Sequence, residues 1–193
     1  MRLSFRRKLL VLLAALVAGA IHAKIITDNL DARADLLGGF ILGCLTLFFV
    51  LTRDRLKLQP VAIWLITTTF SYITAVNIAS YISLGSVMAS YDYSLFTAMT
   101  WGGLVGAVIL SIGYTVTVGN TTAVQVFVTT LAGGALAFSF AILSLAEPKD
   151  TFFPLPGPSF DINPLLFIIW PTVIMAMLLF WPNQKKQRSQ VPK

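Results

Sequence analysis

The sequence predicts an all-α membrane protein in which six transmembrane helices form one bundle, and three observations lead to this fold class. First, 56% of the 193 residues are hydrophobic and only 11% are charged, whereas soluble domains carry about 25% charged residues. Second, the hydrophobic residues gather in six long runs. Third, the basic residues between these runs concentrate on one side of the predicted membrane. Residues 1–193 are therefore expected to form a single integral membrane domain.

The six apolar runs define the predicted spans and loops, because a helix needs about 20 apolar residues to cross a bilayer. The predicted spans cover residues 9–26, 36–52, 60–84, 95–118, 121–146 and 162–181, and a tail covers residues 182–193. Only Gly119 and Asn120 separate the fourth span from the fifth, so these two should form an antiparallel hairpin. Four prolines in the loop at 147–161 prevent a helix there.

The first span has two interpretations. Its basic start, its apolar stretch and the small residues at 18–20 also fit a secretory signal peptide. We predict a retained helix, because Ile25 and Ile26 extend the apolar run and the long Lys24 side chain can reach the interface. Cleavage before Ile21 would instead leave five spans.

The charges predict the orientation. Eleven of the fourteen basic residues, but only one of the eight acidic residues (Asp54), fall on one side of the six spans. These basic residues are Arg2, Arg6, Arg7, Lys8, Arg53, Arg55, Lys57, Lys185, Lys186, Arg188 and Lys193. Basic loops stay in the cytoplasm, so both termini should be cytoplasmic, in a plasma membrane such as the inner membrane of a bacterium. Since these residues lie at helix ends, they set topology, and nucleic-acid binding is not expected.

The sequence offers little material for catalysis. It contains one histidine, His22, and one cysteine, Cys44, and the last five spans carry no Lys, Arg, Asp, Glu or His in their interiors. Hydrolysis needs a nucleophile with a base, or paired carboxylates, and we expect His22 to lie outside the core at the edge of the first span. We therefore predict no catalytic residues, no cofactor and no metal site.

Small residues at four-residue spacing mark close helix crossings. They lie in the second, fourth and fifth spans and comprise Gly39, Gly43, Gly102, Gly106, Gly133 and Ala137. Such rows let helix backbones approach closely. They can serve packing within this bundle or contact with a partner subunit, and the sequence leaves both open.

The third span is the most polar one. Ser71, Thr74, Asn77 and Tyr81 form a stripe along it, and Gln125 lies one turn into the fifth span, near enough to the inner surface to be hydrated. Lipid cannot satisfy an amide, so Asn77 is expected to face the bundle interior. These side chains could bond neighbouring helices or line a path for a solute.

Two functions follow from these patterns. The first is a non-catalytic membrane component that packs in the lipid bilayer with a partner membrane protein or a second copy of itself. The alternative is a channel or carrier for a small neutral solute along the polar face of the third span.

Overall fold

The computed structural model describes residues 3–28, 33–51, 57–85, 91–119, 121–146 and 165–181. Six α-helices occupy these residues: α1 (Phe5–Asp28), α2 (Arg33–Val50), α3 (Leu58–Gly85), α4 (Tyr91–Thr117), α5 (Ala123–Ala146) and α6 (Leu165–Phe180). No strand occurs in the described ranges. The prediction of an all-α protein is thus confirmed for these residues, and each helix overlaps one predicted apolar run.

Four of the helices are long and apolar enough to cross a membrane. Their apolar stretches are Phe5–Ile25, Leu58–Ile78, Phe96–Thr117 and Ala123–Leu143. In α2 and α6 the apolar stretches are shorter, Leu36–Val50 and Leu165–Phe180. These helices indicate a protein embedded in a membrane.

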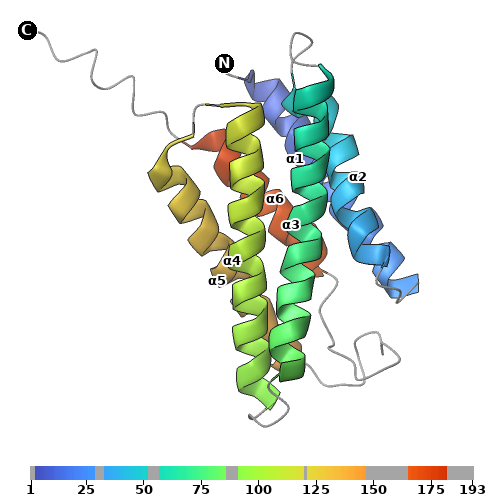
Figure 1. The fold of residues 1–193 in the computed structure, drawn as a ribbon, viewed down its shortest axis with the longest axis vertical. Coiled ribbons are helices and arrows are strands. Elements are labelled where there is room, and N and C mark those ends of the chain that lie inside the picture. Colours follow the sequence, from blue (N-terminus) through green and yellow to red (C-terminus); the bar gives the residue numbers. More distant parts are fainter. Residues whose placement is uncertain are drawn as a thin grey trace, which may run out of the picture.

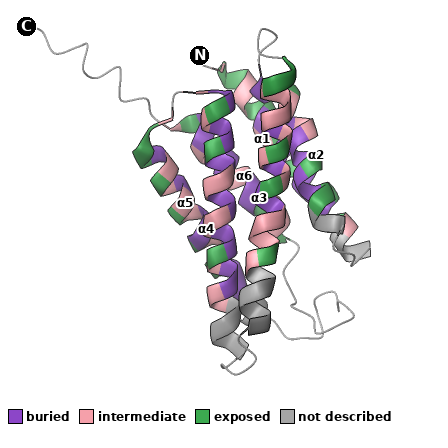
Figure 2. Cartoon of the chain, in the orientation of Figure 1, coloured by how far each residue is buried: buried purple, intermediate pink, exposed green. Residues whose placement is uncertain are grey.

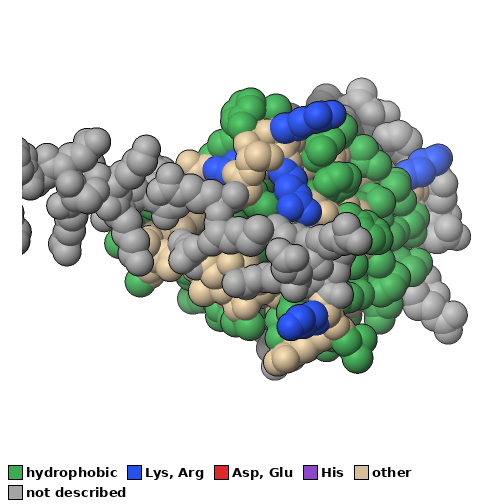
Figure 3. Space-filling model, turned by 90° about the horizontal axis from the view of Figure 1, so that it is seen from above, with side chains coloured by type: hydrophobic (Ala, Val, Ile, Leu, Met, Phe, Trp, Pro, Cys, Tyr) green, Lys and Arg blue, Asp and Glu red, His purple; other side chains and the backbone are tan. Residues whose placement is uncertain are grey.

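Each helix packs against the next one in the sequence, and α6 packs back onto α1, so the six helices form a closed ring. Figure 1 shows that successive helices run in opposite directions and that α6 crosses behind α3 and α4. Helices α1, α3 and α5 begin at the same end of the bundle, where α2, α4 and α6 finish. We call this the basic end, because Arg6, Arg7 and Lys8 lie in the first turn of α1 and Lys57 directly precedes α3. Figure 3, which views the molecule from this end, shows Lys and Arg side chains in blue.

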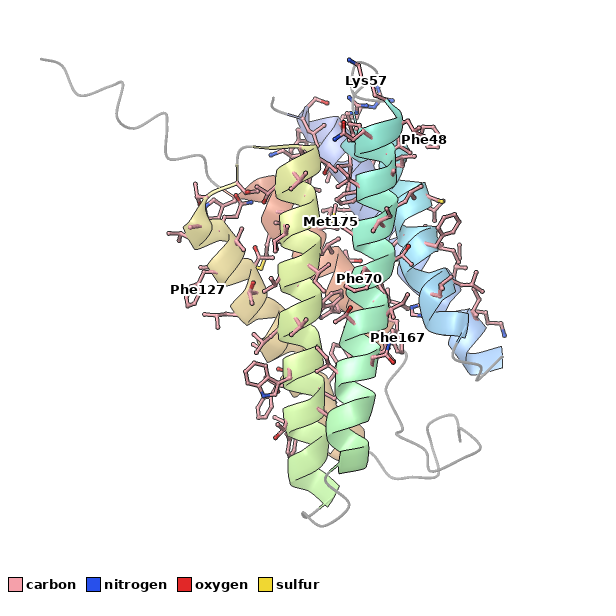
Figure 4. All side chains as sticks on the ribbon, viewed as in Figure 1. Phe48, Lys57, Phe70, Phe127, Phe167 and Met175 are labelled. Atoms are coloured by element: carbon pink, nitrogen blue, oxygen red, sulfur yellow. The ribbon has the colours of Figure 1, made fainter. Side chains whose placement is uncertain are left out.

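The core lies between α1, α2, α3, α4 and α6. Its largest fully buried side chains include Trp64, Leu42, Leu110, Ile174 and Met175. Large apolar side chains also cover much of the outside of the helices, so buried and exposed residues alternate around each helix (Figure 2). Phe48 and Phe127 point away from the bundle (Figure 4). An apolar outer surface of this kind suits a surrounding lipid phase.

Glycines make the close helix crossings. A Cβ atom at Gly39 of α2 would lie 2.6 Å from the carbonyl oxygen of Thr68 in α3. One at Gly103 of α4 would lie 2.7 Å from the Cβ of Ala137 in α5. Because ordinary Cβ contacts are longer, any side chain at these positions would push two helices apart. After α4, Gly119 adopts a φ of 77°, a left-handed conformation that glycine takes at low cost and that turns the chain toward α5.

Candidate functional site

Polar side chains inside the bundle bond from one helix to the next. The Ser71 hydroxyl of α3 donates to the Gly106 carbonyl oxygen of α4 at 2.7 Å. The Trp64 indole of α3 donates to the Thr46 hydroxyl oxygen of α2 at 3.0 Å. In an apolar environment such bonds hold neighbouring helices in register. Ser71, one of the predicted lining residues, is therefore engaged at the α3–α4 contact.

Asn77 does not face the bundle interior, and the prediction that it would do so is wrong. Its side chain is exposed, on the row of α3 that also carries the exposed Ile66 and Phe70. The inward face of α3 is filled by Trp64, Ser71 and Tyr72. Packing of these large and bonded side chains fixes the rotation of the helix, and Asn77 is turned outward as a result. Thr74 is half-buried, and the side chain of Tyr81 lies outside the described residues.

Gln125 is buried rather than hydrated, contrary to the expectation from its position. Its side-chain amide donates to the carbonyl oxygen of Leu178 at 2.9 Å and, at 3.4 Å, to that of Met177. Both carbonyls belong to the last turn of α6, where no helical N–H follows to bond them. Gln125 thus caps α6 from α5. Ser71 and Gln125 serve different helix pairs, and Asn77 faces outward, so the predicted lining residues do not form one surface.

His22 is fully buried in the core, which corrects the expectation that it lies at a solvated edge. Its ring centroid lies 5.1 Å from that of Tyr72 in α3 and 4.8 Å from that of Phe167 in α6, in edge-to-face arrangements. Gly38 of α2 completes the site, because a Cβ atom there would overlap the imidazole. The helix runs on to Asp28, two residues beyond the predicted end of the span at 26, so the imidazole lies more than a turn inside the helix.

Two further buried polar residues were not among the predicted site residues, although the sequence places Thr129 on the same face of its helix as Gln125. Ser111 of α4 and Thr129 of α5 are both fully buried, and neither hydroxyl has a hydrogen-bond partner. The sequence did contain a signal, because Ser111 continues the α5-facing row of Gly103 and Ala107 at four-residue spacing. Serine and threonine are common in membrane helices and usually bond their own backbone, so spacing alone gave no reason to single them out.

The predicted packing residues lie as follows. Gly39 and Gly43 of α2 face Thr68 of α3. Gly106 of α4 lies against the Trp170 ring, 3.0 Å from a Cβ placed on the glycine, and Gly133 of α5 meets Ala107 and Gly103 of α4. Gly102 and Ala137 are buried. Among the described glycines, these crossings are therefore contacts within the bundle.

At the basic end, two side chains of α1 contact the ends of neighbouring helices. The Arg7 guanidinium donates to the carbonyl oxygens of Phe48 and Leu51, at 3.1 and 2.8 Å. These carbonyls lie at the end of α2, where the helix dipole favours a positive charge. The Lys8 ammonium lies 4.9 Å from the centre of the Phe180 ring at the end of α6, within the range of a cation–π contact. Two basic residues of α1 thereby hold the ends of α2 and α6.

The described residues contain no group of three or more His, Cys, Asp or Glu side chains that could hold a metal ion. The apolar helices and the hydrogen bonds between them indicate that the chain is a membrane-embedded helical bundle. Comparisons with protein families, with curated proteins and with solved structures find no match for this chain.

Proposed function

We propose that this chain is a non-catalytic membrane component with six spans, and that it acts by packing against a partner membrane helix. In this proposal α2 and α6 cross the bilayer with the four longer helices, α1 is retained, and the basic end faces the cytoplasm of a bacterial cell. The concentration of basic residues at that end supports this orientation.

The observation that carries the proposal is the exposed amide of Asn77. It lies on an apolar row of α3, with Ile66 64% and Phe70 57% exposed. Counting about 20 residues from Pro60 places Asn77 just inside the outer edge of the hydrocarbon layer. An amide there is costly against lipid and gains from bonding a polar group on a neighbouring helix. The same row offers Phe70 as an apolar contact.

The glycine rows are occupied by contacts within the bundle, which leaves another surface for the partner. They were one candidate surface for a partner, but Gly39, Gly103, Gly106 and Gly133 are used at crossings inside the bundle. The partner contact is therefore assigned to the outer face of α3 and not to a glycine row.

Photo-crosslinking in intact membranes tests the proposal. A benzophenone amino acid replaces Phe70 on α3 or, as the control, Phe127 on α5, which is 62% exposed. We expect a protein adduct from position 70, its loss in the Asn77→Leu variant and its partial retention in Asn77→Gln. Mixed epitope tags show whether the adduct contains a second copy of this chain. Equal crosslinking from positions 70 and 127, or an adduct unchanged by Asn77→Leu, would contradict the proposal.

A further inference from the structure

The contact between α4 and α5 follows a regular register that can be traced layer by layer. A Cβ on Gly133 would lie 2.6 Å from the Cβ of Ala107, so these two residues face each other. In antiparallel helices, one turn from a facing pair leads to the next facing pair. One turn from the Ala107–Gly133 pair toward the basic end, this register places Ser111 opposite Thr129.

This layer also borders α6. The Cδ1 atom of Ile174 would lie 3.3 Å from a Cβ on Gly133. One turn further along α6 is Leu178, whose carbonyl oxygen accepts the bond from Gln125. Gln125 in turn precedes Thr129 by one turn of α5. Ser111 and Thr129 therefore lie where three helices meet, with the carboxamide of Gln125 beside them.

Both hydroxyls in this layer are fully buried and have no partner. Other hydroxyls of α4 and α5 bond the backbone of their own helix, as Thr130 does to the Val126 carbonyl oxygen at 2.8 Å. Leaving a buried hydroxyl unbonded is unfavourable, and native structures almost always provide a partner, often an ordered water. A buried water needs between two and four polar partners, and this layer offers two hydroxyls and a neighbouring amide.

We propose that Ser111 and Thr129 form a binding site for a buried water molecule that joins α4 to α5 beside α6. The water forms one hydrogen bond with each hydroxyl, either donating to its oxygen or accepting from its O–H. It thereby links the two helices at a layer where their side chains do not bond directly.

The test compares variants that separate the hydroxyl from the volume of the side chain. Thr129→Val keeps the shape and removes the hydroxyl, whereas Thr129→Ser keeps the hydroxyl and removes a methyl group. If water is bound, Thr129→Ser in the full chain in mild detergent retains a higher melting temperature than Thr129→Val. We expect Thr129→Val to lower it by roughly 2–4 °C, the shift that one net hydrogen bond gives in a chain of this length.

The partner residue and the control complete the design. Ser111→Ala should lower the melting temperature by a similar amount, and the double variant with Thr129→Val should lower it no further than the larger single effect, because both lose the same water. Thr130→Val, at the adjacent self-bonded threonine, is the control and should show additivity with Ser111→Ala. A melting temperature for Thr129→Val equal to or above that of the unmodified chain and of Thr129→Ser would overturn the proposal and show a dry contact. Additive effects of Ser111→Ala and Thr129→Val would overturn it as well.

Discussion

At the scale of single residues, the imidazole of His22 packs directly against Gly38 of the neighbouring helix α2. The imidazole is fully buried between Tyr72 and Phe167, and the bare Cα of Gly38 forms the remaining wall. A polar ring inside a membrane bundle must be held by protein, since lipid offers it no bond. The glycine at position 38 thus accommodates a histidine on another helix.

This fit predicts a strong coupling between the two positions. Gly38→Ala should destabilise the protein by about 1–3 kcal/mol, because the added methyl group overlaps the imidazole. In a His22→Ala background the same substitution should cost much less, since the smaller side chain leaves space. Thermal unfolding in detergent of the four combinations measures the coupling.

The neighbouring glycine provides the matched control for this coupling. A methyl group added by Gly39→Ala would meet the backbone of Thr68 and Thr69 in α3 and not the imidazole of His22. Its cost should therefore be the same with and without His22→Ala. If Gly38→Ala lowered the free energy of unfolding equally in both backgrounds, the imidazole of His22 would not be what excludes a side chain at position 38.

At the scale of helices, two kinds of contact position the elements: side chains that cap helix ends, and close crossings at glycines. The ends of α2 and α6 are capped from neighbouring helices, by Arg7 and by Gln125. Capping of this kind replaces the N–H groups that a helix lacks after its last turn. The crossings are set by glycines, and α4 meets α5 closely at Gly103 and Gly133.

The Arg7 cap can be tested against its neighbour in sequence. Arg7→Gln should lower the free energy of unfolding by about 1.5–3 kcal/mol, because it removes a charged donor from two helix-end carbonyls. Arg6 is exposed, and Arg6→Gln removes the same charge from the same side of the membrane. Denaturation of both variants in mild detergent separates the cap from the effect of charge on topology. Indistinguishable stabilities would contradict a capping role for Arg7.

The α4–α5 crossing predicts a steric effect. Gly103→Leu should destabilise the bundle by on the order of 3 kcal/mol, because a leucine would push α4 away from Gly133 and Ala137. Ile112, which is 51% exposed on α4, provides the control: Ile112→Ala should change stability little. Similar melting temperatures for Gly103→Leu and Ile112→Ala would place the close crossing elsewhere.

At the scale of the whole molecule, the bundle has one end marked by basic residues and a ring of six helices that closes through α1 and α6. Helix α1 supplies Val11, Ala15 and Ala18 to the core. It is therefore an integral wall of the bundle. The proposed orientation in the membrane rests on the basic residues at this end.

Cysteine labelling checks the proposed orientation on a Cys44→Ala background. Leu58 lies at the basic end and is 85% exposed, so a Leu58→Cys variant should react with an impermeant thiol reagent only after cell lysis. Ser159, in the proline-rich segment outside the described residues, should react in intact cells when replaced by cysteine. The opposite pattern would reverse the orientation.

The sequence by itself predicted the all-helical class and a helix in each of the six apolar runs. Runs of apolar residues and the charges between them suffice for this, because a helix is a local structure and a bilayer demands about 20 apolar residues of each span. Each of the six predicted segments overlaps one helix of the described residues.

Only the tertiary structure decided which way each side chain faces. In a membrane helix both the lipid side and the protein side are apolar, so hydrophobic periodicity does not fix the rotation of the helix about its axis. The outward turn of Asn77, the burial of His22 against Gly38 and the burial of Ser111 and Thr129 all depend on that rotation. The rotation of each helix is set by contacts between residues far apart in the sequence, such as Ser71 with Gly106 and Gln125 with Leu178. A local sequence pattern cannot predict such contacts.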